Sequence, residues 1–161
     1  MVVADTVMHL IFGFGGQLHH CWKNFAGGQG SWHQQVIDNS PNTGDNDWIP
    51  MSTVRGQDLY LFYCKKSTSD IASSQVYYKK WSQVSQSWTA PELVSTTPGT
   101  TRNRDPNTCI RVPESANYIP VFWNSATGGY GIYFNKITLT TPPPDTIPPG
   151  AIMDLRGSEG Q

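Results

Sequence analysis

Short runs that alternate apolar or aromatic residues with polar ones follow one another along most of this chain. Clusters of Gly, Pro, Ser, Asn and Thr separate the runs, a pattern typical of consecutive antiparallel strands. No window shows the 3.6-residue period of an amphipathic helix. The sequence therefore predicts an all-β fold. The expected strands are residues 9–14, 17–23, 31–38, 47–54, 59–64, 75–81, 87–95, 104–112, 118–124 and 131–137. Gly15-Gly16 is expected to turn the first hairpin, because both glycines can take a positive φ.

The series of runs repeats along the chain. Three versions of one strand read HLIFGF, LYLFYC and YIPVFWN, and three versions of the next read QLHHCWK, QVYYKKW and GIYFNKI. Ser31-Trp32 and Ser87-Trp88 lie 56 residues apart, Asp47 and Asp105 lie 58 apart, and Phe62 and Phe122 lie 60 apart. A period of this size, with its drift absorbed by loops, is typical of four-stranded propeller blades.

One blade would contain residues 47–54 as its innermost strand, then 59–64 and 75–81, and residues 87–95 as its outermost strand. The chain would then hold the end of one blade, a complete blade and three strands of another, in repeat units of about 7–46, 47–104 and 105–139. Because closure takes at least four blades, we expect a partial β-propeller of two to three blades from a longer protein, with the remaining blades as partners. Open blade faces and strand edges of this kind are prone to association. A β-sandwich of two facing sheets remains the alternative.

A change of composition follows Leu139. Residues 140–150 (TTPPPDTIPPG) hold five of the chain's twelve prolines and predict a stiff linker. The segment DTIPPGAIMDL, residues 145–155, resembles the linker and opening strand of bacterial fibronectin type III domains. The resemblance implies that residues 151–161 begin a second, truncated domain of that family.

The propeller half, residues 10–139, resembles the sialidase-like superfamily. The matching residues are Tyr77, Tyr78, Lys79, Ser87, Trp88 and Pro91, followed by Arg104, Asp105 and Pro106. The family's Asp-box turn is degenerate here, since its Asp and Gly are missing before Trp88 (QVSQSW). The resemblance implies a secreted or surface carbohydrate-directed protein whose partner is a glycan, either a sialidase-like glycoside hydrolase or a glycan-binding relative. The alternative is a noncatalytic propeller that serves as a scaffold for protein interaction.

A sialidase needs an arginine cluster for the substrate carboxylate, a Tyr with a carboxylate as nucleophile pair, and an acid. Guanidinium groups suit the first task because they bind carboxylates in bidentate fashion. The chain offers Arg55, Arg102, Arg104 and Arg111, with Asp47, Asp105 and Glu114 nearby in sequence. A convergent set at one rim would favour the enzyme, and its absence would favour the scaffold. The carboxylate pair cannot be assigned from spacing, so the catalytic residues stay unknown.

Asp47 and Asp105 precede equivalent innermost strands and are expected at the same rim of the propeller. Asp47, Trp48, Arg104 and Asp105 are therefore the candidate ligand-binding residues, with Trp48 as a sugar-stacking platform. The alternative interpretation is structural, since an Asp or Arg at a repeated position can satisfy backbone groups of the crossover loop. Trp32 and Trp88 occupy repeat-equivalent positions and are expected to insert between blades.

Composition and charge narrow the remaining possibilities. Charged residues make up 14% of the chain and the net charge is −1, which gives no electrostatic reason to expect nucleic acid or an anionic membrane as partner. Insertion into a membrane is not expected either. No signal peptide and no apolar stretch of about 20 residues is visible. His19 and His20 are adjacent on a strand and point to opposite faces, and His9 and His33 have no partnered spacing, so no metal or other cofactor is predicted. Cys21, Cys64 and Cys109 are expected to be buried thiols.

Overall fold

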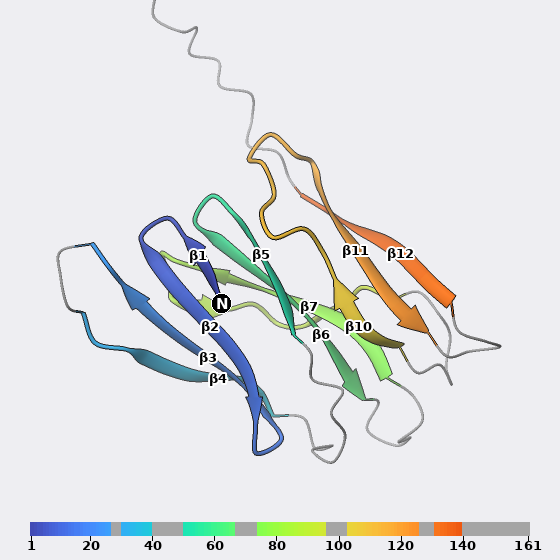
Figure 1. Cartoon of the computed structure of the whole chain (residues 1–161), viewed down its shortest axis with the longest axis horizontal. Coiled ribbons are helices and arrows are strands. Elements are labelled where there is room, and N and C mark those ends of the chain that lie inside the picture. Colours follow the sequence, from blue (N-terminus) through green and yellow to red (C-terminus); the bar gives the residue numbers. More distant parts are fainter. Residues whose placement is uncertain (27–29, 40–49, 67–73, 96–102, 126–130, 140–161) are drawn as a thin grey trace, which may run out of the picture.

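The computed structural model describes residues 1–26, 30–39, 50–66, 74–95, 103–125 and 131–139. These described residues form strands and no helix, which confirms the all-β prediction. Three antiparallel sheets follow one another along the chain and lie side by side in Figure 1, and none of them closes on itself. The sequence segments assigned to the linker and to the fibronectin type III start, residues 140–161, lie outside the described residues.

Each sheet is a meander of strands in sequence order. The first sheet contains β1 (Val2–Ala4), β2 (Val7–Phe14), β3 (Gln17–Asn24) and β4 (His33–Asn39). The middle sheet contains β5 (Met51–Arg55), β6 (Asp58–Lys66), β7 (Ser74–Ser82) and β8 (Ser87–Trp88), with β9 (Glu92–Leu93) also paired to β7. The third sheet contains β10 (Asn103–Asn107), β11 (Tyr118–Ser125) and β12 (Gly131–Thr138). The described strands thus form three sheets and not the two of a sandwich, while the propeller and its repeat units stay predictions.

Local chemistry explains where the predicted strands are right and where they differ. Gly15 and Gly16 both have positive φ values, 56° and 75°, and turn the β2–β3 hairpin as predicted. The sequence does not predict strand β1, because three residues are too few to show an alternating pattern. Since β1 pairs with β2, β2 is the second strand of a four-stranded sheet. The predicted single strand 87–95 is split into β8 and β9 around Pro91, which has no N–H to donate to β7.

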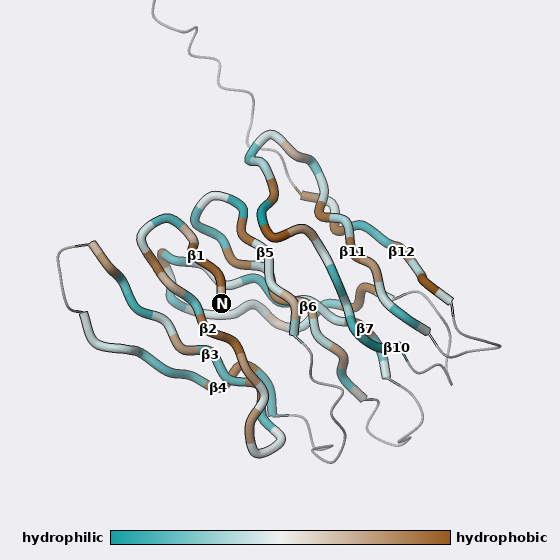
Figure 2. Tube along the Cα trace, viewed as in Figure 1, coloured by the Kyte–Doolittle hydropathy of each residue, from teal (hydrophilic) through white to brown (hydrophobic). Residues whose placement is uncertain are grey.

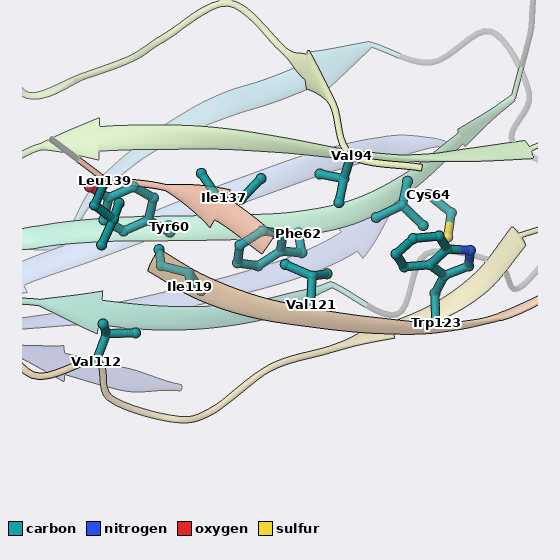
Figure 3. Packing of buried hydrophobic residues seen from close by; sticks show 11 residues of the cluster. Tyr60, Phe62, Cys64, Val94, Val112, Ile119, Val121, Trp123, Ile137 and Leu139 are labelled. Carbon is teal, nitrogen blue, oxygen red and sulfur yellow. The ribbon is translucent and has the colours of Figure 1, made fainter. Parts of the chain in front are cut away.

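Strand β6 is buried on both of its faces. Its six residues from Leu59 to Cys64 are all 5% exposed or less. Leu59, Leu61 and Tyr63 pack against the first sheet, whereas Tyr60, Phe62 and Cys64 pack against the third (Figure 3). A strand that is covered on both faces reads as a continuous apolar run, as LYLFYC does. The middle sheet is therefore the core layer of a three-sheet stack.

A side-chain hydrogen bond from an equivalent strand position links each neighbouring pair of sheets. Lys79 Nζ in β7 donates to the backbone oxygen of Ile37 in the first sheet at 2.7 Å. Asn135 Nδ2 in β12 donates to the backbone oxygen of Val94 at 2.6 Å. The two donors are equivalent, because each follows the residue that pairs with Phe62 or Phe122 in the strand register. Equivalent positions of the two hairpins therefore each donate a hydrogen bond to the neighbouring sheet.

Two histidines are buried between the first and the middle sheet. His9 Nδ1 and His20 Nε2 lie 2.9 Å apart, and both side chains are at most 1% exposed. The indole of Trp81 meets both imidazoles edge-on, with ring centroids 4.8 and 5.3 Å away. Burial lowers the pKa of His9 to about 4, and burial together with the charge of His9 lowers the pKa of His20 to about 3. Hairpin register creates this pair, which sequence spacing did not reveal.

The His9–His20 pair predicts acid-sensitive stability. Both pKa values are lower in the folded chain than the ordinary value of 6.5, so the unfolded chain takes up protons first as the pH falls. Stability is complete above about pH 6.5 and declines below it, by at most about 1.4 kcal/mol per pH unit for each histidine. Urea unfolding between neutral pH and about pH 5 measures this slope. A double variant, His9→Leu/His20→Phe, is expected to flatten the slope, whereas the exposed-site variant His33→Gln retains it. An unchanged slope in the double variant would contradict the assignment.

Phe62 is predicted to be among the most costly side chains to truncate. It is 0% exposed and lies in the cluster between the middle and third sheets. Phe62→Ala is expected to lower the free energy of unfolding by about 3–5 kcal/mol, because it removes buried apolar area and leaves a cavity. Val84→Ala is the control, since Val84 is 90% exposed and its loss should change stability by less than about 0.5 kcal/mol. Equal effects of the two variants in urea unfolding would show that β6 is not the core strand.

Candidate functional site

Two of the four predicted ligand-binding residues belong to β10. Arg104 is partly buried and pairs with Asn124 of β11, and Asp105 follows at a bulge in the β10–β11 register. Asp105 has a left-handed backbone conformation with φ of 50°, and its carboxylate accepts a hydrogen bond from Asn124 Nδ2 at 3.3 Å. Asp47 and Trp48, together with Arg102, lie outside the described residues. The predicted rim is therefore seen only at Arg104 and Asp105, which we call the Arg104 rim.

A buried hydrogen-bond network surrounds Asn103, the residue that precedes Arg104 in β10. The backbone oxygen of Asn103 accepts from Ser74 Oγ at 2.6 Å, and its side-chain oxygen accepts from Trp123 Nε1 at 3.1 Å. Asn103 Nδ2 donates to Gln75 Oε1 at 3.0 Å, and Ser95 Oγ donates to the same oxygen. These bonds tie the beginning of β10 to β7 of the middle sheet. The network gives Asn103 a structural role, whereas the ligand-binding role of Arg104 and Asp105 stays a prediction.

The three described arginines of the predicted group lie at two different ends of the inner strands. Arg55 and Arg111 sit at the opposite end from Arg104, where β5 turns into β6 and β10 leads to β11 (Figure 1). Val112 N donates to the backbone oxygen of Val54 at 2.8 Å and holds these segments together. Arg55 Nη2 donates to the backbone oxygen of Glu114 at 2.6 Å. The described arginines therefore do not converge into the cluster that a sialidase needs.

A cleft of 430 Å³ opens at this end of the inner strands. It is formed by the β1–β2 turn, the β5–β6 turn and the β10–β11 connection, which come from all three sheets. Its lining residues are Asp5, Gly56, Gln57, Arg111, Val112, Pro113 and Glu114. We call this end the Gly56 rim. The described part of the lining is mostly polar, of mixed charge and without an aromatic side chain, so it offers no surface for stacking a sugar ring.

A second cleft, of 280 Å³, lies between the middle and third sheets and shares Arg55 with the Gly56 rim. Its lining residues are Arg55, Tyr60, Tyr78, Lys80, Thr89, Glu92, Ile137, Thr138 and Leu139. Tyr78 Oη donates to Glu92 Oε2 at 2.7 Å, and Lys80 Nζ lies 2.7 Å from Asp58 Oδ2. Lys80 Nζ also lies 5.7 Å from the centre of the Tyr60 ring. We call this the Tyr78 cleft, and among the described residues it best combines aromatic, cationic and carboxylate groups.

The protonation states of the Tyr78 cleft suit binding better than nucleophilic chemistry. Burial raises the pKa of Tyr78, and the hydrogen bond to Glu92 and the charge of Glu92 raise it further. Burial lowers the pKa of Lys80, but the hydrogen bond to Asp58 and the neighbouring Tyr60 outweigh burial and leave the pKa above its ordinary value. At neutral pH the phenol is therefore protonated and the ammonium charged. A tyrosine nucleophile needs the opposite shift, towards the phenolate.

Tyr78 and Arg55 are among the residues that the sequence motifs indicate, whereas the motifs do not indicate Lys80 and Glu92 as their partners. Glu92 belongs to β9 and is the direct cross-strand partner of Tyr78. A signal was present, since the segment after Ser87-Trp88 contains a proline and then an alternating pair, Glu92-Leu93, that can pair with β7 again. The run was interpreted as one outermost strand, and that interpretation concealed the pair.

Three further residue predictions have mixed outcomes. Trp88 packs against His20 of the first sheet, with ring centroids 5.2 Å apart, as expected for a side chain between sheets. Trp32 does not insert between sheets and is 51% exposed. The cysteines are free thiols, and the expectation of burial is right for Cys64, wrong for the exposed Cys109 and only partly met by Cys21.

Neither a metal centre nor a membrane-spanning helix occurs in the part of the chain that the structure describes. Within it, no group of three or more His, Cys, Asp or Glu side chains is arranged to hold a metal ion. Nor does any helix long and apolar enough to cross a membrane occur there.

Comparisons with protein families, with curated proteins and with solved structures find no match for this chain. The sialidase-like and fibronectin type III resemblances therefore remain predictions from the residues that carry them.

The left-handed backbone of Asp105 predicts how substitutions at the Arg104 rim change stability. A left-handed backbone costs an ordinary side chain about 1–2 kcal/mol and costs glycine almost nothing. Asp105→Gly is expected to leave the free energy of unfolding unchanged or slightly raised, whereas Asp105→Val lowers it by about 1–2 kcal/mol.

Asp5 offers a matched control at the other rim, because it has almost the same φ, 51°, in the β1–β2 turn. The same pair of substitutions at Asp5 should give the same two changes in urea unfolding. Asp105→Gly losing stability by more than about 1 kcal/mol would mean that its side chain does more than occupy a turn.

Proposed function

We propose that this chain is a carbohydrate-binding, noncatalytic part of a secreted or surface protein, and that the Tyr78 cleft takes an acidic sugar residue of a glycan. The observation that carries the proposal is the Tyr78–Glu92 hydrogen bond beside the cationic side chains of Arg55 and Lys80. The lining thus contains two cations and one carboxylate. Lys80 is already paired with Asp58, so a sugar carboxylate complements the guanidinium of Arg55, and sugar hydroxyls complement Glu92 and Thr89.

The cleft's dimensions and contacts fit a single sugar ring held weakly. Its volume of 280 Å³ lies just below the range of about 300–1,000 Å³ that small-molecule sites occupy. Arg55 Nε is a buried donor without a hydrogen-bond partner among the described residues, and the same side chain's Nη2 already holds the β10–β11 connection. An anion in the cleft could use the remaining donors of this guanidinium.

Binding is proposed instead of hydrolysis because of the tyrosine. The raised pKa of Tyr78 keeps its phenol protonated, and the described arginines are divided between two rims. The scaffold alternative is favoured by that division of the arginines, since a convergent set at one rim was the feature expected of the enzyme. Sugar binding distinguishes the two functions directly.

The proposal predicts selective binding of acidic monosaccharides. Titration with N-acetylneuraminic acid and with glucuronic acid, followed by NMR chemical shifts, is expected to perturb residues of the Tyr78 cleft, whereas glucose perturbs them less. Lys80→Met is expected to weaken the binding of the acidic sugars about tenfold, because it removes one charge-assisted hydrogen bond. Binding should also weaken as the salt concentration rises.

Lys136→Met is the matched control, because Lys136 Nζ lies over the Tyr118 ring at the same distance, 5.7 Å, on another face of the chain. It should leave sugar binding unchanged. A Lys80→Met protein that is folded and binds acidic sugars as well as the original chain would refute the assignment to this cleft. Absence of any sugar binding would favour the scaffold.

A further inference from the structure

The strand registers show which residues of the middle and third sheets are equivalent. Phe62 pairs with Tyr78 in the middle sheet, and Phe122 pairs with Phe134 in the third. Two pairs further along each hairpin, and therefore on the same face, Cys64–Val76 corresponds to Asn124–Ile132. Because side chains alternate between the faces of a strand, equivalent residues point to equivalent faces. Each sheet therefore has two distinct faces. We call the face that turns towards the preceding sheet in the chain the preceding face, and the face that turns towards the next sheet the following face.

The following face is covered in the middle sheet and exposed in the third. Phe62 and Val76 are 0% exposed because the third sheet packs on them. Their counterparts Phe122 and Ile132 are 44% and 80% exposed, and Phe134 is 56% exposed. The rings of Phe122 and Phe134 lie 5.1 Å apart and form an apolar patch with Tyr118 and Ile132. We call this patch the third-sheet face.

The preceding face is covered in the middle sheet and exposed in the first. Leu59, Leu61 and Trp88 of the middle sheet pack against the first sheet. In the first sheet Val7, His9 and Ile11 turn towards the middle sheet, so the alternate residues of β2 turn outwards, and Figure 2 shows hydrophobic positions along β2.

Exposed apolar side chains collect on this outward side of the first sheet. They are Val3, Leu10, Phe14, Trp32 and Val36, with Phe14 73% exposed. We call this set the first-sheet face. It contains Trp32, the repeat equivalent of Trp88, which explains why one tryptophan is packed between sheets and the other is exposed.

We propose that the first-sheet face of one copy of this chain packs on the third-sheet face of a second copy, head to tail. The chain itself shows twice that a preceding face and a following face fit together, once between the first and middle sheets and once between the middle and third. Each copy therefore exposes both surfaces that such a contact needs, the first-sheet face and the third-sheet face. Contacts between different patches of identical chains are heterologous, and they give closed rings or open filaments.

Light scattering at several protein concentrations tests the association. The original chain is expected to show a mass of at least twice that of the 17.9 kDa monomer, rising with concentration. Phe14→Lys/Trp32→Lys, on the first-sheet face, and Ile132→Lys/Phe134→Lys, on the third-sheet face, are each expected to be folded monomers. All four positions are exposed, so the substitutions spare the core. Val84→Lys, in the exposed β7–β8 turn, is the control that should associate like the original chain.

Mixing the two double variants separates head-to-tail contact from contact between identical faces. Each variant keeps one intact face, so the mixture is expected to form a one-to-one heterodimer although each variant alone is monomeric. An original chain that stays monomeric at every concentration overturns the proposal, as does association that survives in either double variant. A mixture that remains monomeric also overturns it.

Discussion

Burial of β6 on both faces is the constraint on which the rest of the structure depends. A strand whose residues from Leu59 to Cys64 are all apolar or aromatic cannot lie on a surface, because each face exposes large side chains to water. A sheet on each side removes both faces from water at once. The first and third sheets therefore owe their positions to the middle one, and the equivalent hydrogen bonds of Lys79 and Asn135 set how each pair of sheets is aligned.

Strand positions in this fold were predictable where the apolar pattern is long and were missed where it is short or interrupted. The β2–β3 hairpin followed from Gly15-Gly16, and the runs LYLFYC and QVYYKKW gave β6 and β7 with bounds within two residues. Strand β1 was too short to show a pattern, and Pro91 divided a run that looks continuous in sequence. Repeat spacing found the equivalence of Trp32 and Trp88, but it could not say that only one of them has a neighbouring sheet.

The candidate site was harder to predict, because its residues meet through pairing and stacking instead of through spacing. Glu92 reaches Tyr78 only because β9 returns to β7 after the interruption at Pro91. His9 and His20 meet because the hairpin register places them diagonally across β2 and β3. The arginines show the converse, since Arg104 and Arg55 lie at opposite ends of inner strands. The sequence therefore suggested a single group of arginines that the fold separates.

Context, more than residue type, decides what an aromatic side chain does in a repeated β structure. Phe62 and Phe122 are both phenylalanines at equivalent positions of two hairpins, yet Phe62 lies in the core and Phe122 on the surface. Natural surfaces usually carry polar side chains at such places, because contiguous apolar patches promote association. The third sheet instead keeps an aromatic pair, Phe122 and Phe134, where the middle sheet has Phe62 and Tyr78. The exposed apolar residues of the first-sheet and third-sheet faces therefore favour a contact between two copies. That contact would repeat the packing between neighbouring sheets within one chain.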